Sequence, residues 1–295
     1  MSKVRVSVII PTWNAEKILK KNLPKILAAL PKDAEAIVVE NGSTDGSVKY
    51  LRKLKVKNEK LKVIENDKNL GFIGGSGLGA KKAKGEFLAF INNDVIPEPG
   101  FLAPALAHFK DKTVFAVSFD EPQFGWAKIW WKGGFIHHGV GGSGKKAHLS
   151  AWASGGSALV RKSMWQELGG FDPLFAPFYW EDFDLGYRAW KRGWKIIWEP
   201  KSVVHHRHQA TISKLNSSYV DLIKERNQLL FAWKNITDPL MVISQPFGIL
   251  LRILTGPNYI KVLLAALGQY LKYGKKDKGE FVMKDREVIN LFRDK

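Results

Sequence analysis

The chain has 295 residues, 45% hydrophobic and 25% charged, and this balance excludes a disordered or fibrous protein. It contains no cysteine, which excludes disulfides, thiolate metal sites and cysteine nucleophiles. The 46 basic residues exceed the 28 acidic residues, and the resulting formal charge of +18 favours partners that carry phosphate.

Strand and helix patterns alternate through the first half of the chain, which predicts an α/β layer fold. The first strand is predicted at 4–11, and its flanks lack the apolar run of a signal peptide. The second runs through 35–47 into a polar turn, and two more follow at 60–66 and 86–94. No segment reaches the run of about eighteen apolar residues typical of a membrane span, so we expect a cytoplasmic protein.

Each of these strands ends in polar side chains. The polar ends are Thr12 and Asn14, then Glu40 and Asn41, then Asn66 and Asp67, then Asn92 to Asp94. Ligands of open α/β sheets bind beyond the carboxyl ends of the strands. We therefore expect these positions to converge on one crevice.

The later segments differ in character. Residues 110–150 have a looser pattern, and a strand with a short helix is predicted over 157–172. After residue 216 three apolar segments have helical periodicity. We predict an α/β domain over residues 1–215 and a helical extension over residues 216–295.

Two glycine patterns imitate nucleotide-binding motifs without their context. "GVGGSGKK" at 139–146 has Lys146 where a P-loop needs Ser or Thr. "GGSGLG" at 74–79 crowds its glycines too closely for the dinucleotide fingerprint. Neither pattern predicts a binding site.

The segment 178–194, "FYWEDFDLGYRAWKRGW", sets carboxylates among aromatic rings. Its acids are Glu181, Asp182 and Asp184. Such a cluster either caps a helix or performs chemistry. A helix is predicted from about Phe183 to Gly193, and Asp184 alone could cap it.

Several motifs in order resemble the family 2 inverting glycosyltransferases, especially their rhamnosyltransferase-like branch. They are "VSVIIPTWNAEKIL", "VVENGSTDGS", "NLGFIGGSGLGAKKAKGEFLAFINNDV", "SGGSALVRKSMWQELGGFDPLFAPFYWEDFDLGYRAWKRGW" and "VVHHRHQAT". The resemblance covers roughly residues 4 to 235. It implies the GT-A fold, a mixed central sheet flanked by helices, here with a helical C-terminal extension.

The resemblance also implies a nucleotide site. Glu40 stands where the family usually has an aspartate that binds the pyrimidine, which leaves the base preference open. The implied nucleotide- and donor-binding residues are Pro11, Thr12, Asn14, Glu40, Asn41, Asn69, Gly71, Asn92, Asn93, Gly155 and Gly156. A plain turn with helix capping remains an alternative for the residues from Asn41 to Asp45.

The family's metal motif, Asp-x-Asp, reads Asn92-Asn93-Asp94 in this chain. Asp94 offers a hard oxygen suited to Mg2+ or Mn2+, whereas Asn92 offers only a neutral carbonyl. His206 is the implied second ligand, with His205 and His208 as alternatives. These histidines could equally be ordinary loop residues.

The resemblance places the general base at Asp182, with Glu181 beside it. A helix N-terminus favours a carboxylate anion, which can then take a proton. Trp126, Trp130 and Trp131 could form an acceptor platform, although tryptophans are as common in cores.

We therefore expect a metal-dependent inverting glycosyltransferase that uses a UDP- or dTDP-sugar. The expected acceptor is a saccharide or a lipid-linked saccharide of cell-surface polysaccharide synthesis. The C-terminal helices could lie on the inner face of the membrane, on the catalytic domain, or against a second subunit. Alternatives are a non-catalytic sugar-nucleotide-binding relative and a basic nucleic-acid-binding protein, although nucleic acid is not the expected partner.

Overall fold

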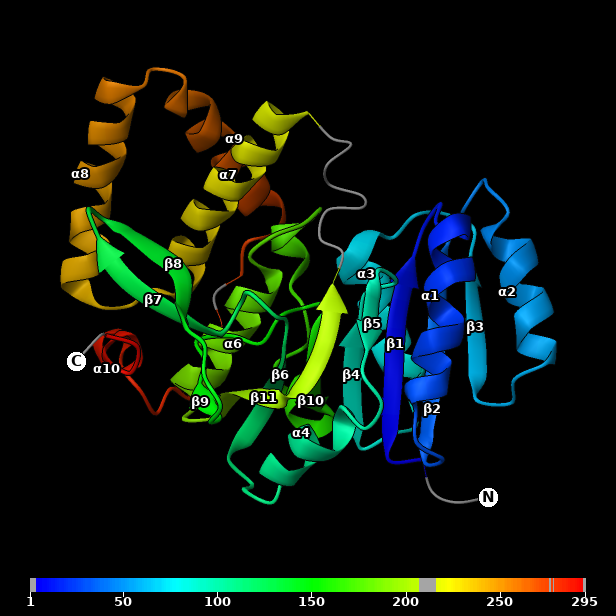
Figure 1. Ribbon diagram of the computed structural model, residues 1–295. Helices are drawn as coiled ribbons and strands as arrows, with labels where there is room; N and C mark the ends of the chain where they lie inside the picture. The colour runs from blue at the N-terminus through cyan, green and yellow to red at the C-terminus, as the bar shows by residue number, and fades with distance from the viewer. Residues whose placement is uncertain (1–3, 207–215, 276, 278, 294–295) are drawn as a thin grey trace.

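The computed structural model describes residues 4–206, 216–275, 277 and 279–293, and a mixed nine-stranded sheet lies at its centre (Figure 1). The strand order is β3-β2-β1-β4-β10-β6-β11-β5, with β9 paired to β11. These strands are β1 (Val6–Thr12), β2 (Ala34–Asn41), β3 (Leu61–Asn66), β4 (Phe87–Ile91), β5 (Val95–Pro97), β6 (Val114–Asp120), β9 (His148–Leu149), β10 (Ser157–Arg161) and β11 (Lys195–His206). Strands β3, β2, β1 and β4 are parallel, and β10 runs antiparallel to both its neighbours. The expected α/β class with a mixed sheet is confirmed.

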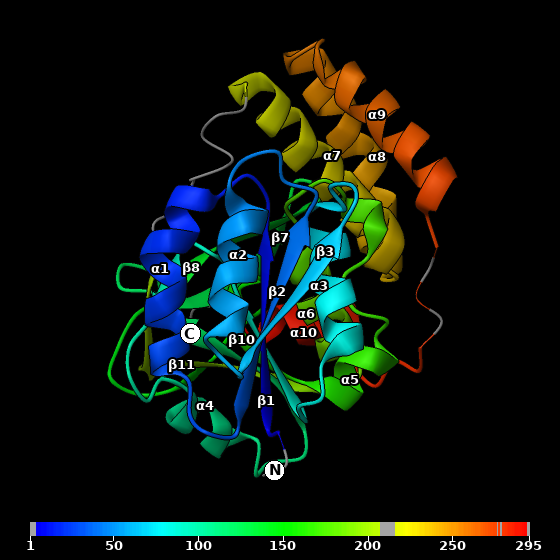
Figure 2. The same cartoon turned by 90° about the vertical axis from the view of Figure 1, so that its right-hand side faces the viewer.

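Helices cover both faces of the sheet (Figure 2). One face carries α1 (Glu16–Ala29), α2 (Ser47–Val56) and α4 (Leu102–His108). The other face carries α3 (Gly71–Lys82), α5 (Lys162–Glu167) and α6 (Glu181–Lys191). Strand β1 is apolar on both faces because Val8 and Ile10 enter the first core and Ile9 enters the second.

The first four predicted strands are present, but residues 110–150 are more regular than expected. They contain β6 and a separate two-stranded ribbon of β7 (Trp126–Lys132) and β8 (Phe135–Gly142). The glycines at 139–142 belong to β8, and those at 74–79 lie inside α3. Neither glycine pattern therefore forms a loop between a strand and a helix.

The C-terminal part is helical, as expected. It contains α7 (Ser217–Asn235), α8 (Pro239–Thr255), α9 (Tyr259–Tyr273) and the short α10 (Asp285–Asn290). Helix α7 packs against α6, α9 and β8, and both views show α7 to α9 at the end of the molecule toward which β1 points (Figures 1 and 2). Among the residues that the structure describes, no helix combines the length and apolarity needed to cross a bilayer. The predicted boundary at 215/216 meets a segment outside the described residues and stays a prediction.

Candidate active site

Polar side chains from separate strands meet at the carboxyl ends of β1 to β4. Asn93 Nδ2 donates to Thr12 Oγ1 over 2.9 Å, which links the end of β4 to the end of β1. Asn66 Nδ2 donates to Asn41 Oδ1 over 2.9 Å, and Asn41 Nδ2 lies 3.4 Å from the carbonyl oxygen of Gly71. Two hydrogen-bonded groups thus contain four of the residues predicted for the nucleotide or donor, which are Thr12, Asn41, Gly71 and Asn93.

The turn after β2 is held by side chains from two predicted nucleotide residues. The buried Glu40 carboxylate accepts hydrogen bonds from the backbone N–H groups of Gly42 (3.2 Å) and Ser43 (2.7 Å). Asn14 Oδ1 accepts from Thr44 N over 2.8 Å, and Asn14 N donates to Ser43 Oγ over 2.8 Å. Glu40 and Asn14, which were predicted to bind the nucleotide, therefore also shape this turn.

A second loop borders the same region. Asn69 Oδ1 accepts from the N–H of Gly71 over 2.8 Å, and Gly71 has a φ of +67°. Only glycine adopts that conformation without strain, and it begins α3 directly beside the strand ends. Pro11 lies on β1 facing this helix, since a Cβ on Gly75 would come within 3.3 Å of its side chain.

Asp94, His206 and Glu121 form a chain of acidic and imidazole groups. His206 Nε2 lies 3.2 Å from Asp94 Oδ1, and His206 Nδ1 lies 3.1 Å from Glu121 Oε2. All three side chains are largely buried. His205 points elsewhere, toward the exposed Glu98 at 2.9 Å, because adjacent strand residues face opposite sides.

The sequence reasoning missed Glu121, which follows β6 and also bonds Ser157 at the start of β10. Its signal was a polar residue at a strand end, the same signal that identified Asp94. His208 lies outside the described residues.

The protonation of His206 follows from this arrangement. Burial disfavours its charge, but hydrogen bonds to Asp94 and Glu121 outweigh burial and raise the pKa of His206 to about 9. His206 therefore keeps its proton between Asp94 and Glu121, in a place where a metal cation could bind instead. No cluster of three or more His, Asp or Glu side chains with metal-binding geometry occurs among the described residues. A divalent ion would thus depend on oxygens from a bound diphosphate as well as on Asp94 and His206.

A glycine loop connects this acidic region to the predicted base. Asn92 N donates to the carbonyl oxygen of Gly156 over 2.9 Å, and Gly155 N donates to Asp182 Oδ2 over 3.0 Å. A Cβ on Gly156 would lie 2.2 Å from Asn92 Nδ2, so a larger residue here would displace the Asn92 side chain. Asp94 and Asp182 are thereby connected through one loop, although they lie 88 positions apart in the sequence.

Helix α6 begins at Glu181, two residues before the predicted start. Tyr179 and Trp180 precede it with φ values of +67° and +77°, so the chain enters the helix through a left-handed turn. Asp182 Oδ1 accepts from the N–H of Phe183 over 2.8 Å. The acid pair therefore occupies the first turn of α6.

Burial dominates the titration of this pair. It raises the pKa of Glu181, and the neighbouring Asp182 charge raises it further. Burial also raises the pKa of Asp182, against the opposing hydrogen bonds from Gly155 and Phe183. Glu181 Oε2 is buried and has no hydrogen-bond partner among the described residues. Asp182 is the more accessible of the two acids.

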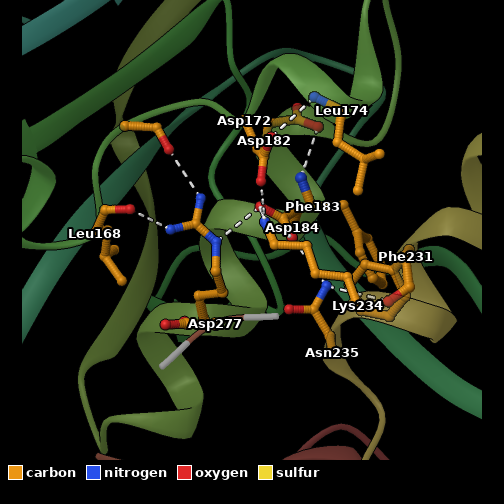
Figure 3. Close-up of polar contacts among 12 residues, drawn as sticks. Leu168, Asp172, Leu174, Asp182, Phe183, Asp184, Phe231, Lys234, Asn235 and Asp277 are labelled. Atoms are coloured by element: carbon orange, nitrogen blue, oxygen red, sulfur yellow. Dashed lines mark hydrogen bonds and ion pairs between the residues drawn. The ribbon is translucent and has the colours of Figure 1, made fainter. Parts of the chain in front are cut away.

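Asp184 does not cap the helix, which was the role that the sequence left open for it. It is fully buried and accepts from Arg188 Nε at 2.8 Å, Lys234 Nζ at 2.9 Å and Asn235 Nδ2 at 2.8 Å (Figure 3). Lys234 also lies 2.7 Å from Asp172. Opposite charges lower the pKa of Asp184 despite its burial, which by itself would raise the pKa. This network fixes α6 against α7 directly below the acid pair.

The aromatic rings beside the acid pair are not those predicted for an acceptor platform. Trp152 and Trp180 contact His138 with ring centroids 5.3 and 5.2 Å apart, and both also contact Phe183. The predicted set, Trp126, Trp130 and Trp131, is divided by strand alternation along β7. Trp126 stacks on His148 and Trp130 on His137, whereas Trp131 donates to Ser244 of α8.

Comparison with protein families gives two matches. The model described as "Glycosyl transferase family 2" matches residues 7–169, and that described as "Glycosyl transferase family group 2" matches residues 89–258. The N-acetylglucosaminyl-diphospho-decaprenol L-rhamnosyltransferase of Mycobacterium tuberculosis is 43% identical over 61 residues, 20% of each chain. Three other curated glycosyltransferases match this chain over only 32% to 39% of their own length.

Two solved structures have the same fold as this chain. GalNAc-T7 with UDP, GalNAc and Mn2+ superposes with a TM-score of 0.66 and 20% identity, over 81% of this chain and 49% of that one. The mannosyltransferase PcManGT from Pyrobaculum calidifontis, in complex with GDP-Man and Mn2+, gives 0.60 and 19%, over 90% and 75%.

Proposed function

We propose that this chain, which belongs to glycosyl transferase family 2 and has the GT-A fold, transfers a sugar with inversion from a nucleotide-sugar to an acceptor hydroxyl. One observation carries the proposal: the Gly155–Gly156 loop bonds the Asp182 carboxylate on one side and the Asn92–Asp94 segment on the other. Transfer needs a proton acceptor close to the site that binds the charged diphosphate, and this loop contacts the residues proposed for both.

The donor is proposed to be a UDP- or dTDP-sugar held at the ends of β1, β2 and β4. Support comes from the polar groups around Thr12, Asn41 and Asn93 and from related folds that bind UDP or UDP-GlcNAc. PcManGT, which has the same fold, binds GDP-Man instead, so the test below also varies the nucleotide base. Glu40 would act here by fixing the turn through Gly42 and Ser43.

The residues fit a divalent ion when the diphosphate is counted among its ligands. Mg2+ and Mn2+ prefer oxygen donors, which Asp94 offers, and His206 adds an imidazole nitrogen 3.2 Å from Asp94. A bound ion would supply Lewis-acid stabilisation of the charge that gathers on the diphosphate. The two related folds named above hold Mn2+ with their nucleotides.

Asp182 is proposed to act as general base. Its carboxylate takes the proton of the acceptor hydroxyl while that oxygen forms a bond to the anomeric carbon. The bond from that carbon to the diphosphate oxygen breaks, and the nucleoside diphosphate keeps the electron pair. Gly155 and Phe183 hold the carboxylate by their N–H groups, which fixes its position before the acceptor arrives.

The acceptor is proposed to be a saccharide or a lipid-linked saccharide of cell-surface polysaccharide synthesis. A partial match to an enzyme named for a decaprenol-linked acceptor supports this class, as does one to a poly(ribitol-phosphate) beta-glucosyltransferase. The rings of His138, which packs on the buried Trp180 next to the acid pair, and of Trp152, which packs on His138, would form the sugar-stacking surface.

A panel of UDP-, dTDP- and GDP-sugars, each with Mn2+ or with chelator, tests the donor proposal. We expect one nucleotide class to raise the unfolding temperature in the presence of Mn2+, since a ligand that binds only the folded state stabilises it. The stabilising donor should also be hydrolysed slowly in the absence of acceptor. Stabilisation without any hydrolysis would favour a non-catalytic sugar-nucleotide-binding protein, for which Asn92 in place of aspartate is the supporting feature.

A further inference from the structure

Helices α8 and α9 expose many large apolar side chains, which we call the apolar face. Its members are Leu240, Val242, Ile243, Phe247, Leu250, Leu251 and Leu254 of α8, and Ile260, Leu264, Leu267 and Leu271 of α9. Their exposed fractions run from 43% to 86%. So many exposed apolar side chains on two helices in contact mark an interaction surface rather than ordinary protein surface.

The orientation of the two helices is set by their other side. Met241, Gln245 and Gly248 of α8 are buried, and a Cβ on Gly248 would lie 2.2 Å from the Gly133 carbonyl oxygen of the β7–β8 ribbon. Val262 and Ala266 of α9 are buried in the same way. Both helices are therefore fixed by an inner stripe, and the apolar face is the side left without a partner among the described residues.

Charge identifies the partner. Residues 239–276 contain no aspartate or glutamate but five cations, Arg252, Lys261, Lys272, Lys275 and Lys276. Lys261, Lys272 and Lys275 are exposed, whereas Arg252 turns inward to Gln228 and Tyr259. A second copy of this surface would bring like charges together with no acid from this stretch to pair them. Anionic lipid would pair the lysines at its headgroups and receive the apolar side chains at the acyl boundary.

We propose that the apolar face of α8 and α9 docks on an anionic lipid bilayer, lying in its interface. No described helix could span a membrane, which agrees with the interfacial arrangement. Helices α8 and α9 stand at the end of the molecule toward which β1 and β11 point (Figures 1 and 2), and the candidate active site lies at the carboxyl ends of β1 to β4. The inference deepens the proposed function and rests on it, because docking would bring the candidate active site to a lipid-linked acceptor.

The test is flotation of the full chain with two kinds of vesicle, phosphatidylcholine alone or phosphatidylcholine with about 30% phosphatidylglycerol. No nucleotide-sugar is present. We expect binding to the anionic vesicles that weakens as salt rises. The double substitution Phe247→Glu and Leu254→Glu should lower binding about tenfold or more, because both side chains are exposed apolar contacts. Lys261→Gln with Lys272→Gln should lower it about 30-fold, from loss of two headgroup contacts.

The matched control is Val56→Glu, which changes an 88% exposed apolar residue on α2, away from this face, and should leave binding unchanged. Equal loss with Val56→Glu, or equal binding to neutral and anionic vesicles, would overturn the proposal. So would a wild-type dimer that binds no vesicles and dissociates on Phe247→Glu with Leu254→Glu, since a second copy would then cover the face. Asp182→Asn should bind vesicles like wild type, so failure of the catalytic proposal and failure of this one are separable.

Discussion

Asp182 is the residue on which the proposed chemistry depends most directly. Asp182→Asn keeps the shape of the side chain but removes the proton acceptor. We expect turnover to fall by about 10²- to 10⁴-fold, with nucleotide affinity retained. Asp33→Asn, at the opposite end of the sheet before β2, is the matched control and should be fully active. A transfer assay measures turnover and calorimetry measures nucleotide affinity for the two variants. Near wild-type turnover of Asp182→Asn would contradict the proposal that Asp182 is the general base.

The raised pKa of Asp182 gives a second consequence at the same residue. A base acts only as the carboxylate, so activity should be lost as pH falls through a pKa that burial has placed above the usual 3.8. The acidic limb of kcat/KM should therefore lie above the range of an exposed aspartate. A limb at or below the ordinary value, measured where the protein stays folded, would contradict this.

His206 and His205 provide a test of the metal ligand within two adjacent residues. His206→Ala removes the side chain 3.2 Å from Asp94, whereas His205→Ala removes an exposed ring paired with Glu98. We expect His206→Ala to weaken Mn2+-dependent UDP binding about tenfold or more, and His205→Ala to leave it unchanged. Calorimetric titration with and without Mn2+ decides, and equal effects of the two substitutions would argue against the ligand role.

At the scale of elements, the contact between α6 and α7 depends on Asp184. Asp184→Asn would leave Arg188 buried without its carboxylate and would remove one of the two carboxylates that contact Lys234, the other being Asp172, which costs about 3–5 kcal/mol. Urea unfolding measures the loss. Lys20→Gln, which breaks the exposed pair with Glu16, is the control and should change the midpoint little. A similar small change in Asp184→Asn would show that the network contributes little.

The lowered pKa of Asp184 also fixes the sign of its pH dependence. Its folded pKa lies below the unfolded value near 3.8, so its contribution is complete above that value and is lost as pH falls through the folded pKa. The free energy of unfolding of the wild type should therefore fall more on acidification than that of Asp184→Asn, which lacks this contribution at every pH.

The sequence predicts local features of these elements better than their long-range partners. Apolar runs with polar ends predict β1 to β4 because each pattern lies within one segment. The β7–β8 ribbon was missed because its glycines weaken the strand signal. The buried role of Asp184 was missed because its partners Lys234 and Asn235 follow 50 and 51 residues later. Glu121 was missed for the same reason, since His206 comes 85 residues after it.

At the scale of the whole molecule, the helical extension is part of the support of the active site. Asn227 Nδ2 of α7 lies within 3.1 Å of the carbonyl oxygens of Phe175, Phe178 and Tyr179. These carbonyls belong to the segment that makes the left-handed turn into α6. At the far end, the buried Asp285 accepts from Tyr187 and Lys191 of α6. Helix α6, which carries the proposed base, is thus held by both ends of the extension.

These contacts predict that residues 1–215 do not fold alone, although the sequence divides the chain there. Removing residues 216–295 would expose the α7-facing side of α6 and leave Asp184 without Lys234 and Asn235. We expect the truncated chain to show no cooperative thermal transition by circular dichroism. The full chain with Phe247→Glu and Leu254→Glu is the control, because it alters only exposed positions and should melt like wild type. A truncated chain that melts cooperatively and binds UDP would instead show that the two parts are independent domains, and that α7 acts on the acid pair only as a neighbour.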